Sequence, residues 1–205
     1  MVDKLRVGLI GAGGIARAHA NACAQVDEVE LVAVSDVSVE HARKLGSEWS
    51  VDACYGSVDA MLSDQQLDIA IICTWGVFHA SVGIEVARSN RVRAILCEKP
   101  FTQTADEARQ LVDAAAESGV LIAEAFKFRH HPMHLRAQAL IDSGAIGRLL
   151  SVRSTFCASV AESNRRPELN WRFNRAQGGG SIYDLACYNI HHARAAFGEE
   201  PQRVF

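Results

Sequence analysis

The chain has 205 residues, of which 49% are hydrophobic, and a formal net charge of −3. This length and apolar content are enough for a buried core, and its Lys and Arg residues are dispersed, which gives no basic surface for nucleic acid or an anionic membrane. Lys4 and Arg6 precede only a short apolar run, which is typical of a first strand and not of a signal peptide, and no run reaches membrane-spanning length. We therefore expect a cytoplasmic protein without nucleic-acid or membrane partners.

Apolar strand-like runs alternate with helical patterns over the first 124 residues. The expected strands are residues 5–10, 30–35, 68–73, 94–98 and 120–124, and the expected helices are residues 15–26, 39–49, 77–89 and 104–118. Alternation of this kind predicts βαβ units and a doubly wound parallel sheet covered on both faces. We therefore predict an α/β protein with an N-terminal Rossmann domain at residues 1–124.

The pattern changes in residues 125–205, where we place a second domain. An aromatic, histidine-rich segment precedes an expected helix over residues 132–143, a glycine turn and a long strand over residues 149–159. His130, His131 and His134 do not predict a metal site, because Pro132 interrupts their spacing and no acidic or cysteine partner is adjacent.

The first strand is followed by a glycine-rich turn of the form G-x-G-x-x-A. Its members are Gly11, Gly13, Gly14, Ile15 and Ala16. In a dinucleotide fingerprint the first glycine makes the turn, the second lets a pyrophosphate approach the backbone, and the small third residue allows close helix packing. The alternative is a glycine turn with no ligand.

Asp36 ends the second expected strand about twenty residues after the fingerprint, where an acid accepts hydrogen bonds from the adenosine ribose. A carboxylate at this place repels a 2′-phosphate, and no arginine immediately follows Asp36. This favours NAD over NADP as the cofactor.

Glu98, Lys99 and Pro100 follow the apolar run of the fourth strand. A lysine placed at the end of a buried strand and followed by a stiffening proline is a candidate acid–base group. The alternative is a surface lysine at the start of a loop.

A second polar group follows the triple glycine Gly178–Gly180. Asp184 and Tyr188 are four residues apart in a helix-like segment, so both side chains are expected on one face. A phenol beside a carboxylate is a workable proton-transfer pair, and a nearby ammonium such as Lys99 would favour the phenolate. By themselves the two residues also fit a solvated carboxylate and a half-buried aromatic.

Together these motifs resemble the Gfo/Idh/MocA oxidoreductase family. The resemblance rests on Gly11–Ala16, Asp36, Glu98-Lys99-Pro100 and the stretch Gly178–Tyr188, and it covers essentially the whole chain. It implies a Rossmann domain followed by an α+β domain with an open antiparallel sheet, of which residues 125–205 would be only part. The chain resembles one branch of this family, that of dihydrodiol dehydrogenases, glucose–fructose oxidoreductases and aldose 1-dehydrogenases. The motifs that carry this resemblance are Tyr188, Glu124-Ala125-Phe126, Phe128-Arg129, His131-Pro132 and Gly198-Glu199-Glu200-Pro201.

The resemblance also implies roles for individual residues. Lys99 would lie beside the nicotinamide and the substrate hydroxyl, Asp184 would orient the substrate, and Tyr188 would take its proton. The other residues expected at the cofactor or substrate are Glu98, Arg129, Thr74, His79, Trp171 and Arg172. For the last two, a packing tryptophan and a surface arginine remain the alternative.

Two departures from the family pattern stand out. Trp75 and Gly76 replace the usual proline and asparagine after Thr74, and we expect Trp75 to pack on the adenine or nicotinamide side of the cofactor. Family members also continue well beyond the length of this chain, which suggests a truncated form.

We therefore expect an NAD(P)-dependent dehydrogenase, with NAD favoured over NADP, that transfers a hydride between nicotinamide and a hydroxyl-bearing carbon of a sugar, cyclitol or related cyclic polyol, without a metal. A homo-oligomer through the C-terminal sheet is expected for a complete chain. The alternatives are a catalytically silent regulatory protein that binds NAD and a sugar, or an inactive fragment.

Overall fold

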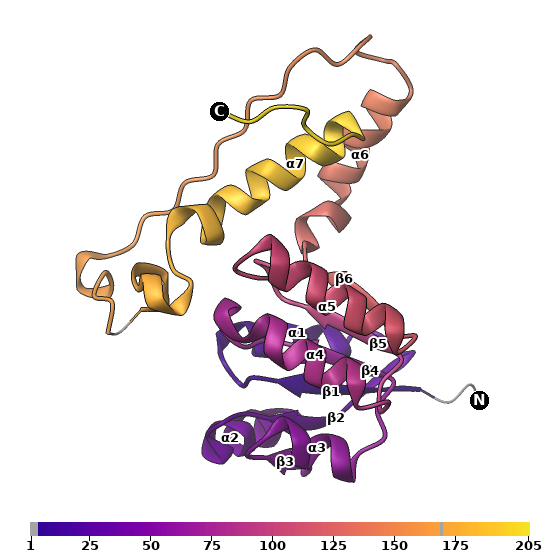
Figure 1. The fold of residues 1–205 in the computed structure, drawn as a ribbon, viewed down its shortest axis with the longest axis vertical. Helices are drawn as coiled ribbons and strands as arrows, with labels where there is room; N and C mark the ends of the chain where they lie inside the picture. The colour runs from indigo at the N-terminus through magenta and orange to yellow at the C-terminus, as the bar shows by residue number, and fades with distance from the viewer. Residues whose placement is uncertain (1–3, 169) are drawn as a thin grey trace. The chain divides into compact units, whose positions relative to one another are not determined.

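The computed structural model describes residues 4–168 and 170–205, and the chain divides into two compact units. The first unit ends at Ala125 and the second runs from Phe126 to Phe205 (Figure 1). Each unit is described by itself below.

Unit 1 is built on a parallel sheet of six strands in the order β3-β2-β1-β4-β5-β6. The strands are β1 (Leu5–Ile10), β2 (Val29–Ser35), β3 (Cys54–Tyr55), β4 (Ile69–Ile72), β5 (Ala94–Cys97) and β6 (Leu121–Glu124). The strand order reverses between β1 and β4, and in open parallel sheets ligands bind beyond the carboxyl ends of the strands at such a point.

Three of the five helices of unit 1 begin at a side chain that caps them. They are α1 (Gly14–Cys23), α2 (Val39–Trp49), α3 (Val58–Asp64), α4 (His79–Arg88) and α5 (Ala105–Glu117). Ser38 and Ser57 cap α2 and α3, and Thr104 and Glu107 form a reciprocal capping box at the start of α5. Figure 1 shows α4 and α5 side by side against the sheet.

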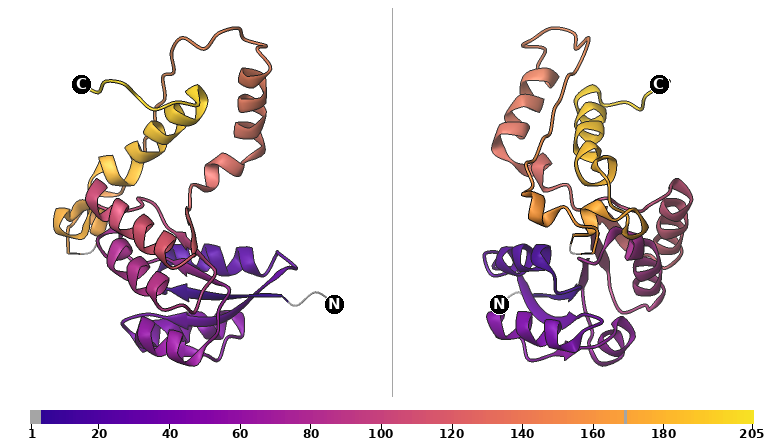
Figure 2. Two further views of the ribbon diagram at one scale, coloured as in Figure 1. Left: turned by 45° about the vertical axis from the view of Figure 1, so that its right-hand side comes forward. Right: turned by 90° about the vertical axis from the view of Figure 1, so that its left-hand side faces the viewer.

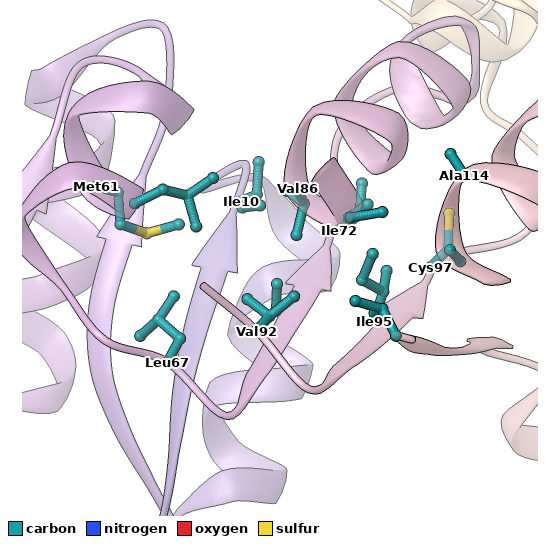
Figure 3. Packing of buried hydrophobic residues seen from close by; sticks show 14 of the residues in the cluster. Ile10, Met61, Leu67, Ile72, Val86, Val92, Ile95, Cys97 and Ala114 are labelled. Carbon is teal, nitrogen blue, oxygen red and sulfur yellow. The ribbon is translucent and has the colours of Figure 1, made fainter. Parts of the chain in front are cut away.

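Two apolar clusters cover opposite faces of the sheet because side chains alternate along each strand. Val7 and Leu9 of β1 pack with α1 and α2, whereas Ile10 points to the other face and packs with α3, α4 and α5. Figure 3 shows this second cluster, in which Ile72, Ile95 and other strand residues meet helical side chains. This packing confirms the predicted doubly wound class.

All five predicted strands and all four predicted helices of unit 1 are present, each with bounds within a few residues of those expected. The bounds of the first strand agree with the prediction. The sequence analysis missed β3 and α3. A two-residue strand and a seven-residue helix are too short to show a hydrophobic period, so only the packing reveals them.

Unit 2 contains two main helices, α6 (Pro132–Asp142) and α7 (Cys187–Phe197). Pro132 occupies the first turn of α6, where its missing N–H costs nothing, and the His131 side chain caps the same end. A π-helical segment, Ile182–Ala186, leads directly into α7.

The predicted strand over residues 149–159 is wrong, because these residues have no regular structure. They belong to a long irregular segment, drawn in orange between α6 and α7 (Figure 2). The described residues of unit 2 contain no strand, so the expected antiparallel sheet is not shown. An extended segment needs a neighbour for its backbone hydrogen bonds, and no described strand supplies one.

Candidate active site

The predicted motifs of unit 1 meet at one edge of the sheet. The fingerprint follows β1, Asp36 follows β2, Thr74 follows β4, and Glu98 follows β5. Because all six strands are parallel, their carboxyl ends lie along the same side of the sheet, and these residues lie just beyond those ends.

The fingerprint turn leaves room for a ligand over the start of α1. Gly11 has a φ of 93°, and a Cβ atom there would lie 2.9 Å from the backbone carbon and oxygen of Cys73. Cβ atoms added to Gly13 or Gly14 would meet no atom within 4 Å. Gly13 is the N-cap of α1, gives no side-chain cap, and no acidic residue lies in the first helical turn.

These features suit a cofactor with a pyrophosphate. The positive end of the helix dipole and the first backbone N–H groups of α1 face open space, as an anion requires. Ile15 is half-buried, and Ala16 is fully buried against the sheet, so the small third residue allows the close packing that the motif predicts. The residues present therefore fit an NAD(P) cofactor.

Asp36 is held in place by the backbone around the fingerprint. Its Oδ2 accepts a hydrogen bond from the Ala12 N–H at 2.7 Å, and its Oδ1 accepts one from the Ser38 N–H at 2.9 Å. The next side chain, Val37, is 98% exposed and carries no charge. The carboxylate is thus fixed beside the turn, and an apolar residue stands where a phosphate-binding cation would be useful.

The loop after β4 combines a buried histidine with exposed aromatic rings. His79 is 1% exposed, its Nδ1 lies 2.8 Å from the Pro100 carbonyl oxygen, and its Nε2 lies 3.1 Å from the Thr74 carbonyl oxygen. Trp75 and Phe78 are about half exposed, and their rings stack with centroids 6.5 Å apart. His79 therefore ties the loop after β4 to the loop after β5 and has almost no free surface of its own.

Glu98 and Lys99 continue directly from β5. The Glu98 side chain is almost buried, with Oε1 2.8 Å from His19 Nε2 and Oε2 accepting the Lys99 N–H at 3.1 Å. Lys99 is half-buried, and its bond to Pro100 is cis. The sequence analysis missed His19, although its position three residues after Ala16 places it on the buried side of α1.

Two thiols near this edge are poor nucleophiles. Burial raises the pKa of Cys73 well above its usual range, and the negative charge of Glu98 adds to the shift. Burial also raises the pKa of Cys97, with smaller contributions from Glu124 and Glu98. Both side chains therefore stay as neutral thiols that fill the core.

In unit 2 the triple glycine packs against the predicted Trp171-Arg172 pair. A Cβ atom on Gly179 would lie 2.2 Å from the Trp171 carbonyl oxygen, and the Gly180 N–H donates to the Arg172 carbonyl oxygen at 2.9 Å. The Arg172 Nε donates to Asp184 Oδ2 at 2.9 Å, and its guanidinium lies 4.9 Å from the centre of the Trp171 ring. Arg172 therefore orients Asp184, a contact that the sequence analysis did not anticipate.

Tyr188 lies at the start of α7 in an aromatic cluster. Its ring makes edge contacts with Phe126, Phe128 and Phe156, with centroids 5.2 to 5.7 Å apart. Tyr188, Phe128 and Phe156 also line a cavity of about 910 Å³. Asp184 lies in the π-helical segment, so the two residues are joined by a turn wider than the regular helix that was expected.

His191 closes the same cluster and stacks on Phe126 at a centroid distance of 4.2 Å. Burial lowers its pKa, and the positive charges of Arg129, Arg194 and His192 lower it further. Arg129 itself is exposed.

In the part of the chain that the structure describes, no group of three or more His, Cys, Asp or Glu side chains is arranged to hold a metal ion. None of the helices there is long and apolar enough to cross a membrane.

Lys99 belongs to unit 1, whereas Tyr188, Asp184, Trp171 and Arg172 belong to unit 2. The pairing of Lys99 with Tyr188 stays a prediction. Within unit 2, Arg172 contacts both Trp171 and Asp184.

The fold and the glycine turn define an NAD(P)-binding Rossmann domain. Residues 5–126 match the oxidoreductase family with an NAD-binding Rossmann fold, and residues 134–205 match the Gfo/Idh/MocA C-terminal domain. The chain belongs to the Gfo/Idh/MocA oxidoreductase family.

Curated relatives and solved structures agree with this assignment. The chain is 31% identical to levoglucosan dehydrogenase of Pseudarthrobacter phenanthrenivorans, over 97% of the chain and 52% of that protein. It is 32% identical to D-xylose 1-dehydrogenase (NADP(+)) 2 of Haloferax volcanii, over 97% of the chain and 58% of that protein. The structure of a levoglucosan dehydrogenase with NADH and levoglucosan has a TM-score of 0.85 and 28% identity, over 96% of the chain and 55% of that structure. The chain thus spans little more than half the length of these proteins.

Proposed function

We propose that this chain carries the cofactor site and part of the substrate site of an NAD(P)-dependent dehydrogenase. Its reaction would move a hydride between nicotinamide and a hydroxyl-bearing carbon of a sugar, cyclitol or related cyclic polyol. The observation that carries the proposal is the open glycine turn at α1, which shares a sheet edge with Lys99. The sugar dehydrogenases among the relatives support the substrate class.

NAD is the preferred cofactor in this proposal. Asp36 has both carboxylate oxygens turned to the backbone of the fingerprint and of Ser38, so the negative charge is fixed beside the turn. The Asp36 carboxylate would repel a 2′-phosphate, and the next residue, Val37, carries no positive charge to offset this repulsion. Relatives and neighbours include both NADP and NADH proteins, so the argument rests on Asp36.

The reacting groups have separate tasks. An NAD(P) cofactor held at the fingerprint turn would supply the hydride chemistry, whereas residues of the protein orient the substrate and handle the proton. Tyr188 takes the hydroxyl proton, and the Lys99 ammonium stabilises the phenolate and the developing alkoxide. Asp184 holds the substrate, and Arg172 holds Asp184 through the 2.9 Å ion pair.

The remaining predicted residues support these tasks. Trp75 offers an exposed ring to the cofactor, while Thr74 and His79 shape the loop on which Trp75 stands. Arg129 is proposed as a substrate contact. A cytoplasmic location and a homo-oligomer formed through the C-terminal sheet also stay predictions.

Two measurements test this function. Titration with NADH and NADPH, followed by cofactor fluorescence, should give saturable binding with tighter binding of NADH. Reduction of NAD and NADP should then be measured against a panel of aldoses, inositols and dihydrodiols. Turnover with any of them would exclude the catalytically silent regulatory protein. Binding without any turnover would favour the regulatory protein or the inactive fragment, and no binding of either cofactor would refute the proposal.

A further inference from the structure

A histidine–glutamate pair links the fingerprint helix to the strand that carries Lys99. His19 lies on α1, and its Nε2 is 2.8 Å from Glu98 Oε1 at the end of β5. Both side chains are largely buried, with exposed fractions of 16% and 10%. A hydrogen bond in such surroundings is shielded from water and holds its geometry better than an exposed one.

The pair reaches across one intervening strand. In the sheet β4 lies between β1 and β5, so the link joins the helix that follows β1 to the end of a strand about 10 Å from β1. Cys73, the residue that follows β4, is buried. The link therefore spans the switch point of the sheet, where the cofactor is proposed to bind.

The second oxygen of Glu98 acts on Lys99. Glu98 Oε2 accepts the Lys99 N–H at 3.1 Å, and the Glu98 N–H donates to the Ile72 carbonyl oxygen at 3.0 Å. The backbone of Lys99 is thus oriented by a carboxylate whose own orientation depends on His19. Removing the His19 side chain would leave Glu98 Oε1 without its histidine partner. The nearly buried Glu98 carboxylate would then turn towards other donors.

We propose that His19 is a positioning residue that sets the spacing between the pyrophosphate-binding turn and Lys99. This inference rests on the proposed dehydrogenase function. α1 begins at the fingerprint, so a contact from its second turn to Glu98 connects the phosphate end of the site to the reacting end. A displacement of about 1 Å at a reacting group can reduce turnover by about 10²-fold, so a loosened link should affect turnover more than cofactor affinity.

The test compares His19→Ala with His19→Gln, because glutamine keeps an N–H donor near the position of the imidazole Nε2. Arg17→Ala is the matched control, since it removes an exposed ion pair to Glu48 from the same helix. Amide hydrogen exchange at Lys99 is measured in the protein without cofactor. ADP-ribose affinity reports the phosphate end alone, and kcat and KM are measured with the substrate found in the panel.

In His19→Ala, the exchange of the Lys99 amide should become about 10-fold faster and kcat should fall about 10-fold or more, whereas ADP-ribose affinity should change by less than about 2-fold. His19→Gln should recover most of both losses, and Arg17→Ala should behave as the unchanged protein. Parallel losses of kcat and ADP-ribose affinity would place His19 in the phosphate site and overturn the proposal. Unchanged exchange at Lys99 would overturn it as well.

The exchange and ADP-ribose measurements separate this inference from the proposed function, because neither needs turnover. If the unchanged protein shows no dehydrogenase activity, the function fails while the exchange result still decides the role of His19. If His19→Ala does not fold, His19→Leu replaces it. Leucine fills much of the space of the imidazole but has no N–H donor, so Lys99 exchange should again increase, and unchanged exchange would overturn the proposal.

Discussion

Replacing Gly13 with alanine should block the cofactor without weakening the fold. Gly13 has a φ of −77° and a ψ of −169°, which alanine adopts without strain, and the added methyl group would meet no atom within 4 Å. Alanine restricts the unfolded chain, which stabilises the protein by about 0.4–1 kcal/mol, whereas it is a poorer N-cap than glycine by a similar amount. The two effects offset each other, so the free energy of unfolding should change by less than about 0.5 kcal/mol.

Cofactor affinity should respond differently. The methyl group would stand in the open space over the α1 N-terminus, where the pyrophosphate must approach the backbone. The Kd for NADH should therefore rise at least about 10-fold, which corresponds to about 1.4 kcal/mol.

Gly11→Ala provides the contrast. At a φ of 93°, alanine is strained by about 1–2 kcal/mol, and its Cβ atom would press on the Cys73 backbone at 2.9 Å. We expect a loss of at least about 2 kcal/mol, or a fall in Tm of roughly 4–8 °C for a chain of this size.

Thermal unfolding by circular dichroism, with and without NADH, measures both effects, since a ligand that binds only the folded state raises Tm. Gly13→Ala should melt like the parent protein but lose most of the stabilisation by NADH. Unchanged NADH binding in Gly13→Ala would show that the pyrophosphate lies elsewhere. A Tm as low as that of Gly11→Ala would show that the packing around Gly13 has been misread.

Four further outcomes are expected. Asp36→Ser combined with Val37→Arg should shift cofactor preference towards NADP by about 1–3 kcal/mol in fluorescence titrations, because it replaces a repelling carboxylate with a phosphate partner; a parent protein that already prefers NADP would contradict this. Lys99→Met should lower kcat by about 10² or more with a much smaller change in NADH affinity, and equal losses would make Lys99 a cofactor anchor. Tyr188→Phe should lower turnover by roughly 10²–10⁴ with little change in Tm, and an unchanged rate and pH profile would make the ring a packing residue only. Because folding lowers the pKa of His191, the folded chain binds fewer protons than the unfolded chain, and Tm should decrease as the pH falls below about 6.5. His191→Gln should weaken that decrease when Tm is measured over a series of pH values.

The sequence by itself determined the parts of this protein that depend on local pattern. Hydrophobic periodicity located the strands and helices of the Rossmann domain except β3 and α3, because burial of alternate strand residues and of one helix face leaves a regular spacing in the chain. The turn at Gly11 was also predictable, since a positive φ demands a particular residue type, whereas the ribose contact of Asp36 and the approach of a pyrophosphate to Gly13 stay predictions.

The tertiary structure decided the contacts between residues that are distant in the chain. His19 and Glu98 are 79 residues apart, and their hydrogen bond forms because the fold brings helix α1 close to the end of β5. Arg172 and Asp184 are brought together at Gly179, which has no Cβ atom and therefore lets its backbone contact that of Trp171. Nothing in the local pattern of either pair names its partner.

The strand predicted over residues 149–159 also shows that a local pattern does not decide tertiary contacts. Its apolar pattern satisfies the local requirement for a strand, but a strand also needs backbone partners from another part of the chain. The described part of unit 2 contains no such neighbour, and the segment has no regular structure. Local sequence encodes how a segment is able to fold, whereas hydrogen bonding and burial between distant segments decide which of those structures forms.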